Sequence, residues 1–463
     1  MPKYILSLIL LIAFTNNLNS QLSDSAVIQS ISNYALNSST AYDNLRYLCK
    51  QIGNRISGST QLYQAEKWGY ITLLQAGTDT VYTQTCQVPH WVRGSTETGT
   101  YKWLSSKNGA LTVTENKVNI SSLGNSQGTS GKALTAPLIA VQNFAELEKL
   151  GEAVKGKIVL FNYAFNQNYL RTFMGYANAV PYRVQSASKA AKLGAVAVVV
   201  RSVSSSTDNN PHTGVQRYTD SVTKIPAVAI GVQDAITLNN LLQNGKVLFT
   251  LTNTATMLTD TLGSNVIGEI RGNLYPNQII TVGGHLDSWD IGEGAHDDGA
   301  GIVQSIAVLE YLKKIGYKPQ HTIRAVLFTN EENGGSGGEK YAAQAILNKE
   351  EHIAAIESDA GGFTPIGFGG TMTDAQFTKF ASWLPLLKVV NINEITKGGG
   401  GSDIAPLAKK LGTPTIGLQP DSQRYFDLHH SRNDTFEQVS RRELQLGAAA
   451  IASLVYLIDK YGL

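Results

Sequence analysis

The sequence predicts an α/β protein with a mostly parallel central sheet flanked by helices and a smaller β-rich inserted domain. From about residue 264 onward, short β-rich segments alternate with helical patterns, which is typical of a parallel sheet. Between about residues 108 and 260, β-branched runs such as KIVLFNY and IPAVAIGV are separated by loops rich in Ser, Thr, Asn and Gly. The segment 23–87 has a helical pattern. We expect it to pack with the C-terminal part, which makes the middle an insertion.

The elements of the C-terminal part can be predicted in chain order. NQIITVGG is a strand, and a helix over 298–315 follows, with Lys313 and Lys314 in its last turn and Gly316 after it. The remaining predicted elements are the strand TIRAVLFT, a helix through KYAAQAIL, the strand HIAAIES, a helix near 375–387, the strand VVNINEI, a helix over 404–411, the strand PTIGL and a helix over 441–460. We therefore expect one main domain over 21–107 and 261–463, interrupted by an inserted domain over 108–260.

Composition and the N-terminus limit the compartment and the partners. Of 463 residues, 42% are hydrophobic and 16% charged, and the net charge is +2, which argues against disorder and nucleic-acid binding. Lys3 precedes an apolar run over 5–14 that is too short to span a membrane, so residues 1–20 are predicted to be a secretory signal. A buried first element is the alternative. The protein is thus expected to be secreted or periplasmic, and pairing of Cys49 with Cys86 stays open.

Acidic and histidine residues follow several predicted strands. Because the carboxyl ends of parallel strands meet at one edge of a sheet, we expect these side chains to converge. They come from the segments HLDSW, GAHDD, FTNEE, ESD and YFDLHH, and they are His285, Asp287, Asp297, Glu331, Glu332, Asp359, His429 and His430.

Histidine and carboxylate ligands without thiolates are suited to Zn²⁺ or a similar divalent ion. Two ions bridged by one carboxylate would explain how so many neighbouring acids stay ionised. Each residue also has an ordinary explanation: Asp297 and Asp298 can cap a helix, Glu331 and Glu332 can form a solvated turn, and paired histidines are common on surfaces. Their coincidence at successive strand ends favours the metal site.

The motifs HLDSW, GAHDDGAG, FTNEENGGSGG, ESDAGGF and HHSRNDT, in this order, resemble the co-catalytic zinc aminopeptidase and glutamate carboxypeptidase family. GNRISGS near the N-terminus resembles the segment that opens the catalytic domain of such enzymes, and the middle region resembles their inserted protease-associated domain. The resemblance covers most of the chain after the signal. It implies a zinc-peptidase fold that hydrolyses short peptides, such as dipeptides or peptides with a free N-terminus.

The resemblance also implies two zinc ions per chain and a role for each residue. His285 and Asp359 would hold one zinc, Glu332 and His430 the other, and Asp297 would bridge them. Asp298 would support or cap, Asp287 would orient the His285 imidazole, and Glu331 would be the general base. The residues predicted to contact the substrate or its oxyanion are His429, which stands where some relatives carry a tyrosine, and Ser402 and Asp403 in the run KGGGGSDIAP. For His429, a surface or supporting role is the alternative. For Ser402 and Asp403, the alternative is a flexible loop in which one of them caps the next helix.

Two rival functions can be tested. GGSGG at 334–338 formally fits the nucleophile motif of serine hydrolases, with Ser336 as the nucleophile, but that motif should directly follow a strand. Some relatives have lost the metal ligands and act as binding proteins, whereas this chain has a suitable residue at each ligand position. The expected partner is a short peptide, without nucleic acid or a membrane span, and a homodimer stays open.

Overall fold

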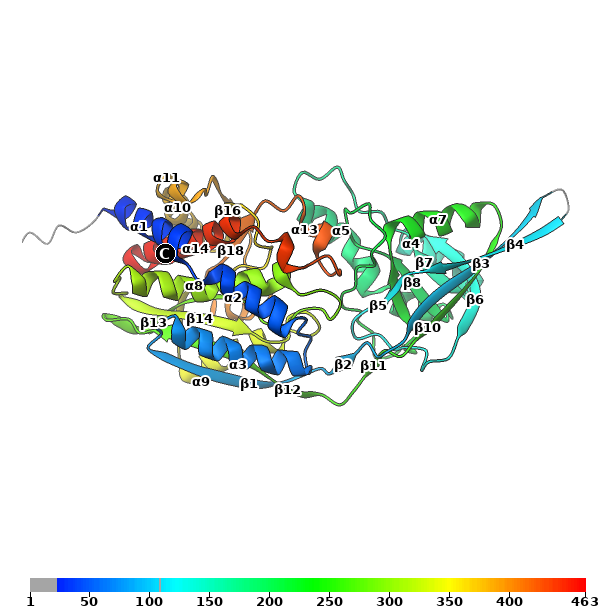
Figure 1. Cartoon of the computed structure of the whole chain (residues 1–463), viewed down its shortest axis with the longest axis horizontal. Coiled ribbons are helices and arrows are strands. Elements are labelled where there is room, and N and C mark those ends of the chain that lie inside the picture. The colour runs from blue at the N-terminus through cyan, green and yellow to red at the C-terminus, as the bar shows by residue number, and fades with distance from the viewer. Residues whose placement is uncertain (1–22, 108–109) are drawn as a thin grey trace, which may run out of the picture.

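The computed structural model describes residues 23–107 and 110–463, so the predicted secretory segment lies outside the described residues. The chain forms two lobes joined by a narrow neck (Figure 1). The N-terminal helix α1 (Asp24–Ser38) and the C-terminal helix α14 (Arg441–Tyr461) lie in one lobe, and the middle of the chain forms the other. No helix of the described ranges combines the length and hydrophobicity that a membrane span requires. The predicted α/β class with an insertion is confirmed.

The main lobe is built on a mixed sheet whose central strands are parallel. The strand order is β1-β12-β14-β13-β15-β18-β16-β17, with parallel pairing from β14 through β13 and β15 to β18. Antiparallel strands flank this parallel centre. The strands are β1 (Thr80–Val88), β12 (Thr261–Ile270), β13 (Tyr275–His285), β14 (His321–Phe328), β15 (Glu351–Glu357), β16 (Pro365–Thr371), β17 (Glu394–Lys397) and β18 (Thr415–Pro420).

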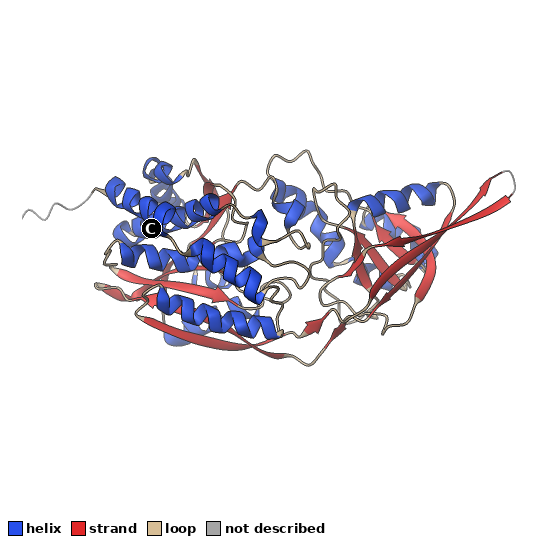
Figure 2. Ribbon diagram, viewed as in Figure 1, coloured by secondary structure: helices blue, strands red, loops and turns tan. Residues whose placement is uncertain are grey.

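Helices cover both faces of this sheet (Figure 2). The large core on one face joins strand residues such as Ile280 and Ile323 to apolar residues of α1, α2, α3, α8 and α14. The smaller core on the other face joins Val326 and Phe328 to α9 and α12. Alternation of side chains along each strand supplies both faces, which is why β14 is buried along its whole length. The remaining helices are α2 (Ala41–Tyr47), α3 (Thr60–Gln75), α8 (Ala300–Lys314), α9 (Ser336–Asn348), α10 (Asp374–Ser382), α11 (Leu384–Leu387), α12 (Ala405–Leu411) and α13 (Tyr425–Leu428).

The inserted lobe has its own sheet and core. Its strand order is β4-β3-β10-β6-β7-β8-β9-β5, with parallel pairing from β6 to β9. Its strands are β3 (Glu97–Lys107), β4 (Ala110–Val118), β5 (Ile120–Ser122), β6 (Leu134–Val141), β7 (Ile158–Phe161), β8 (Ala197–Arg201), β9 (Ala227–Ile230) and β10 (Lys246–Asn253). Its helices are α4 (Phe144–Leu150), α5 (Thr172–Val184), α6 (Ser186–Lys192) and α7 (Val232–Gln243).

The neck is a two-stranded ribbon in which β2 (Trp91–Val92) pairs with β11 (Thr256–Met257). The inserted sheet already begins at β3, ahead of the predicted boundary at residue 108. β3 pairs along its length with β4 and β10, so it belongs to the inserted sheet. We propose that the insertion runs between the two neck strands.

Some local predictions were wrong. The end of the segment predicted to be helical, 23–87, is the strand β1, which is fixed by antiparallel pairing with β12. In the predicted strand VVNINEI, residues Lys388–Val390 form a 3-10 turn and β17 starts only at Glu394. Cys49 and Cys86, whose pairing was open, are both free thiols within the described chain.

Candidate metal centre

The predicted ligands meet at the carboxyl edge of the parallel strands. His285 ends β13, Glu332 lies in the turn after β14, and Asp359 follows β15. Asp297 lies between β13 and α8, and His430 follows α13. All five residues are largely removed from solvent.

A first group forms around His285. Its Nε2 atom lies 3.3 Å from Oδ1 of Asp297 and 3.5 Å from Oδ1 of Asp359. The other ring nitrogen, Nδ1, is 2.9 Å from the backbone carbonyl oxygen of Asp287. With Nδ1–H donated to that carbonyl, Nε2 presents a lone pair to the space between the carboxylates.

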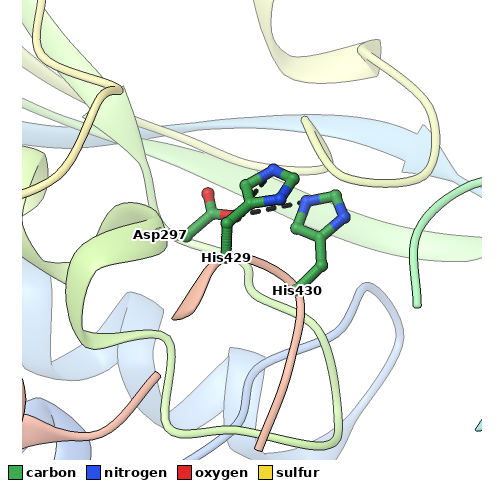
Figure 3. A group of neighbouring side chains, drawn as sticks. All are labelled: Asp297, His429 and His430. Atoms are coloured by element: carbon green, nitrogen blue, oxygen red, sulfur yellow. Dashed lines mark ion pairs between the residues drawn. The ribbon is translucent and has the colours of Figure 1, made fainter. Parts of the chain in front are cut away.

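A second group of side chains lies around the other carboxylate oxygen of Asp297, Oδ2. Nε2 of His430 lies 3.2 Å from Oδ2 of Asp297 and 3.1 Å from Oε2 of Glu332. Nε2 of His429 also approaches Oδ2 of Asp297, at 3.6 Å, and the two histidine rings stack (Figure 3). Asp297 therefore faces one group with each oxygen.

The donor set fits divalent cations. Within the described part of the chain, His285 Nε2, Asp297 Oδ2 and Glu332 Oε1 are buried and have no hydrogen-bond partner. Leaving such atoms unpaired is costly, whereas one cation bound in each of the two groups would satisfy them. Imidazole and carboxylate ligands without thiolate suit Zn²⁺.

The pKa values of the site residues reflect crowding of buried acids, which a bound cation would relieve. Burial disfavours a charge on His430, but Glu332 and Asp297 outweigh it and raise the pKa to about 9. Burial and the charge of Asp297 raise the pKa of Glu332 to about 8. Burial raises the pKa of Asp359 to about 6, against the opposing effect of His285. The protein alone thus holds protons where metal ligands must release them.

Asp287 has a different contact from the predicted one. Its carboxylate accepts hydrogen bonds from the backbone N–H groups of Glu331 (3.0 Å) and Glu332 (3.2 Å), and stays 3.9 Å from Nδ1 of His285. Only its backbone carbonyl orients the imidazole. The side chain instead fixes the turn that presents both glutamates. Glu331 itself is partly exposed beside the buried Glu332.

Asp298 makes contacts of the supporting and capping kind that the resemblance implies for it. Its carboxylate accepts from the backbone N–H of His285 (3.0 Å) and of Gly301 (2.9 Å), so it caps the start of α8 and fixes the end of β13. His296 turns away from Asp297 and stacks on Phe363.

Sequence comparisons identify the family of the chain. The model of Peptidase family M28 matches residues 265–455, and the model of the PA domain matches residues 134–238. Carboxypeptidase Q of Mus musculus is 35% identical over 419 residues, covering 90% of this chain and 85% of the mouse protein, and carboxypeptidase Q of Homo sapiens gives the same values. The chain belongs to peptidase family M28. The predicted family and metallopeptidase class are confirmed.

Solved structures show the same fold. A peptidase M28 precursor from Shewanella amazonensis is 29% identical, with a TM-score of 0.87, covering 94% of this chain and 96% of that one. A zinc aminopeptidase from Bacillus subtilis is 20% identical, with a TM-score of 0.64, covering 91% and 95%. At that identity the likeness concerns the fold alone.

This M28 peptidase has a cavity next to the predicted ligands, at the carboxyl edge of the parallel strands. A cavity of about 440 Å³ opens beside Asp359 and is lined from both lobes. Its apolar wall includes Leu170 and Met174 from the inserted lobe and Leu418 from β18. Its acidic lining residues are Glu357, Asp359, Glu394 and Asp421.

The predicted substrate residues Ser402 and Asp403 do not line this cavity, although Gly399 and Gly400 of the same loop do. Ser402 is exposed, and Asp403 is buried. The backbone N–H groups of Asp403 and Ile404 donate to Oε2 of Glu357, which anchors this loop under the site.

Three supporting residues were not assigned from the sequence. Asp434 accepts from the backbone N–H groups of His296 (2.7 Å) and Asp297 (3.1 Å). The fully buried Arg55 donates to the carbonyls of Leu286 and Gly294, which fixes the segment between the ligands. Glu357 holds the glycine-rich loop. Arg55 lies in the motif GNRISGS and Asp434 in HHSRNDT. Both segments were therefore singled out from the sequence, but the hydrogen bonds of these two side chains were not predicted.

Ser336 does not have the surroundings of a catalytic nucleophile. It begins α9, and its backbone N–H donates to Oδ1 of Asn330. Over residues 23–107 and 110–463, its hydroxyl makes no hydrogen bond to a histidine. The serine-hydrolase alternative is thus left without a base.

Proposed function

We propose that this M28 peptidase is exported and uses two zinc ions to hydrolyse dipeptides or other short peptides with a free N-terminus. The observation that carries the proposal is the carboxylate of Asp297, whose oxygens face two separate histidine-carboxylate groups. A carboxylate in this position can bridge two cations. Export is supported by the apolar segment after Lys3.

Each proposed ion has its own ligands. His285 and Asp359 would hold one zinc, and Glu332 and His430 the other. His430 is preferred over His429 because its Nε2 contacts both Asp297 and Glu332, whereas His429 approaches only Asp297 of these two acids. When bound, the ions polarise the scissile carbonyl and make a nearby water molecule more acidic.

The chain supplies the proton transfers. Glu331 is proposed to take a proton from the attacking water and to deliver it to the leaving amine. Asp287 positions Glu331 through the hydrogen bond to its backbone. Burial and the neighbouring His430 lower the pKa of His429 well below its usual value, so its imidazole stays neutral and keeps one N–H donor. We propose that this donor holds the oxyanion.

The cavity favours a short substrate with a free amino group. Its volume of about 440 Å³ lies within the usual range for small ligands. Its lining combines apolar side chains with four acids and a single cation, Arg171. Such a lining would attract a protonated N-terminus and accept an apolar side chain. A broader aminopeptidase is the alternative, and a series of peptides of increasing length would separate the two by kcat/KM.

The deciding experiment is zinc per chain by elemental analysis, paired with dipeptide hydrolysis before and after chelation. We expect about two zinc ions and activity that is lost on chelation and restored by zinc. Hydrolysis by a metal-free protein would contradict the proposal. Zinc binding without hydrolysis of any peptide would instead support a non-catalytic binding protein.

A further inference from the structure

The inserted lobe holds the loop that carries both histidines. We call residues 426–433 the histidine loop. Ser204 Oγ donates to the carbonyl of Phe426 (2.7 Å), and the backbone N–H of Thr213 donates to the carbonyl of His430 (2.8 Å). His212 Nδ1 lies 2.7 Å from the carbonyl of His429. The loop is therefore bonded to a different lobe along most of its length.

His430 needs this external support because of its backbone. It has a φ of 61°, in the left-handed region that side chains other than glycine rarely adopt. A residue in this conformation persists when surrounding contacts determine it. The contacts to the backbone of His430 come from the inserted lobe through Thr213.

One buried arginine of the inserted lobe also reaches the His430 ring. Arg183 of α5 is 3% exposed, and its Nη1 lies 3.2 Å from Nδ1 of His430 and 3.4 Å from the carbonyl oxygen of Thr213. Its Nη2 donates to the hydroxyl of Tyr176 (2.9 Å). The Tyr176 ring stacks on Phe426, inside the histidine loop.

The Thr213 carbonyl is the acceptor that a metal-binding His430 requires. It lies 3.3 Å from Nδ1 of His430, on the side of the ring opposite the Nε2 that faces Glu332 and Asp297. A histidine that coordinates through Nε2 donates its Nδ1–H to such a carbonyl, which fixes the ring orientation. Arg183 donates to this same carbonyl through Nη1 and to the hydroxyl of Tyr176 through Nη2. With Nδ1–H of His430 given to the carbonyl, Arg183 only packs beside the ring, because both groups are then donors.

We propose that Arg183 is a positioning residue through which the inserted lobe sets the orientation of His430 and hence the affinity of one of the two zinc sites. The inference rests on the proposed function, since it assumes that His430 is a zinc ligand. The inserted lobe would then have two roles: it lines part of the cavity, and it helps to position a ligand of the metal centre.

The test compares zinc affinities of purified full-length variants by competition with a chromogenic chelator. Arg183→Met removes every polar contact and keeps an apolar stem, and we expect one of two zinc affinities to fall about 10- to 100-fold. Tyr176→Phe removes only the hydroxyl that Arg183 bonds, so a smaller loss at the same site is expected. Arg183→Lys should restore part of the affinity. The control is Arg201→Met, because Arg201 lies on β8 of the same lobe and its guanidinium bonds Asn162.

A second readout separates ring orientation from general destabilisation. Cobalt substituted for zinc should give an altered visible absorption spectrum in Arg183→Met and an unchanged one in Arg201→Met. Two unchanged affinities in Arg183→Met and Tyr176→Phe would overturn the inference, as would an equal loss in Arg201→Met. If Arg183→Met does not fold, Tyr176→Phe still decides. A wild-type chain that binds no zinc would instead overturn the proposed function itself.

Discussion

Asp297 is the residue on which the proposed chemistry depends most. Burial would raise the pKa of its carboxyl, but His285 and His430 reverse the effect and hold it well below its usual range. The carboxylate is therefore charged at neutral pH. A permanent negative charge between two imidazoles is a suitable bridge for cations.

Glu331 can be tested separately from the ligands. We expect Glu331→Gln to keep its zinc content and to lower kcat by about 10²- to 10⁴-fold, because the amide cannot accept the proton. Glu339→Gln, in the exposed first turn of α9, is the matched control and should keep both zinc and turnover. Wild-type turnover in Glu331→Gln, or loss of its zinc, would refute the assigned role.

Asp287 tests positioning at the same scale. Asp287→Asn keeps the size of the side chain, but one carboxylate oxygen becomes an N–H₂ donor that cannot accept from the backbone of Glu331 or Glu332. We expect kcat to fall about tenfold or more while KM changes little, because the turn that presents Glu331 loosens. Steady-state kinetics on a dipeptide provide the measurement. A change confined to KM would indicate a substrate contact instead.

The site residues that could be predicted from the sequence are histidines and acids that directly follow predicted strands. Supporting contacts were harder to predict, because they join distant segments. Asp434 bonds the backbone of Asp297 across 137 positions, and a single sequence contains no trace of that pairing. Asp287 was predicted to act on His285, yet its side chain turns toward the next strand end.

At the scale of elements, a partly buried acid links α3 to the sheet and makes the free energy of unfolding depend on pH. Oε1 of Glu66 accepts from the backbone N–H of Ser264, and burial raises the pKa of Glu66 from 4.5 to about 7. The folded state thus favours the protonated form. Below about pH 4.5, Glu66 does not lower the free energy of unfolding. Between about pH 4.5 and 7 it lowers this free energy increasingly, and above about pH 7 the loss no longer grows.

Glu66→Gln should therefore stabilise the protein only at high pH. The amide keeps an oxygen acceptor and carries no charge, so we expect the free energy of unfolding at pH 8 to exceed that of the wild type by on the order of 2 kcal/mol, and the gain near pH 4 to be small. Thermal unfolding at both pH values measures the difference. Glu115→Gln, on the exposed face of β4, is the control. An equal gain at both pH values would show that charge is not the cause.

The elements that could be predicted are those with strong periodicity or continuous apolar runs, such as β13, β14, α8 and α14. The antiparallel strands β1 and β12 were missed. β1 alternates exposed and partly buried residues without a continuous apolar run, and its pairing partner is separated from it by the whole insertion. Tertiary pairing decided these segments.

For the whole molecule, metal binding should be visible as stability. The proposed ligands join β13, β14, β15 and the histidine loop, so a bound ion connects elements that would separate on unfolding. We expect chelation to lower the melting temperature and zinc to restore it. The free energy of unfolding should rise by about 1.4 kcal/mol per bound ion for each tenfold excess of free zinc over Kd. Magnesium should not restore the melting temperature, because imidazole ligands favour zinc. An unchanged melting temperature would contradict a shared metal centre.

The neck has a consequence for how such a molecule arises. Val92 and Thr256 are directly paired, so the chain leaves the main lobe and returns to it at the same place. An ancestral gene could gain the whole second lobe as one cassette spliced into a single hairpin, without disturbing the order of any strand around the join. Because the inserted lobe now bonds the histidine loop, a descendant that lost the insertion at this hairpin would also lose those contacts.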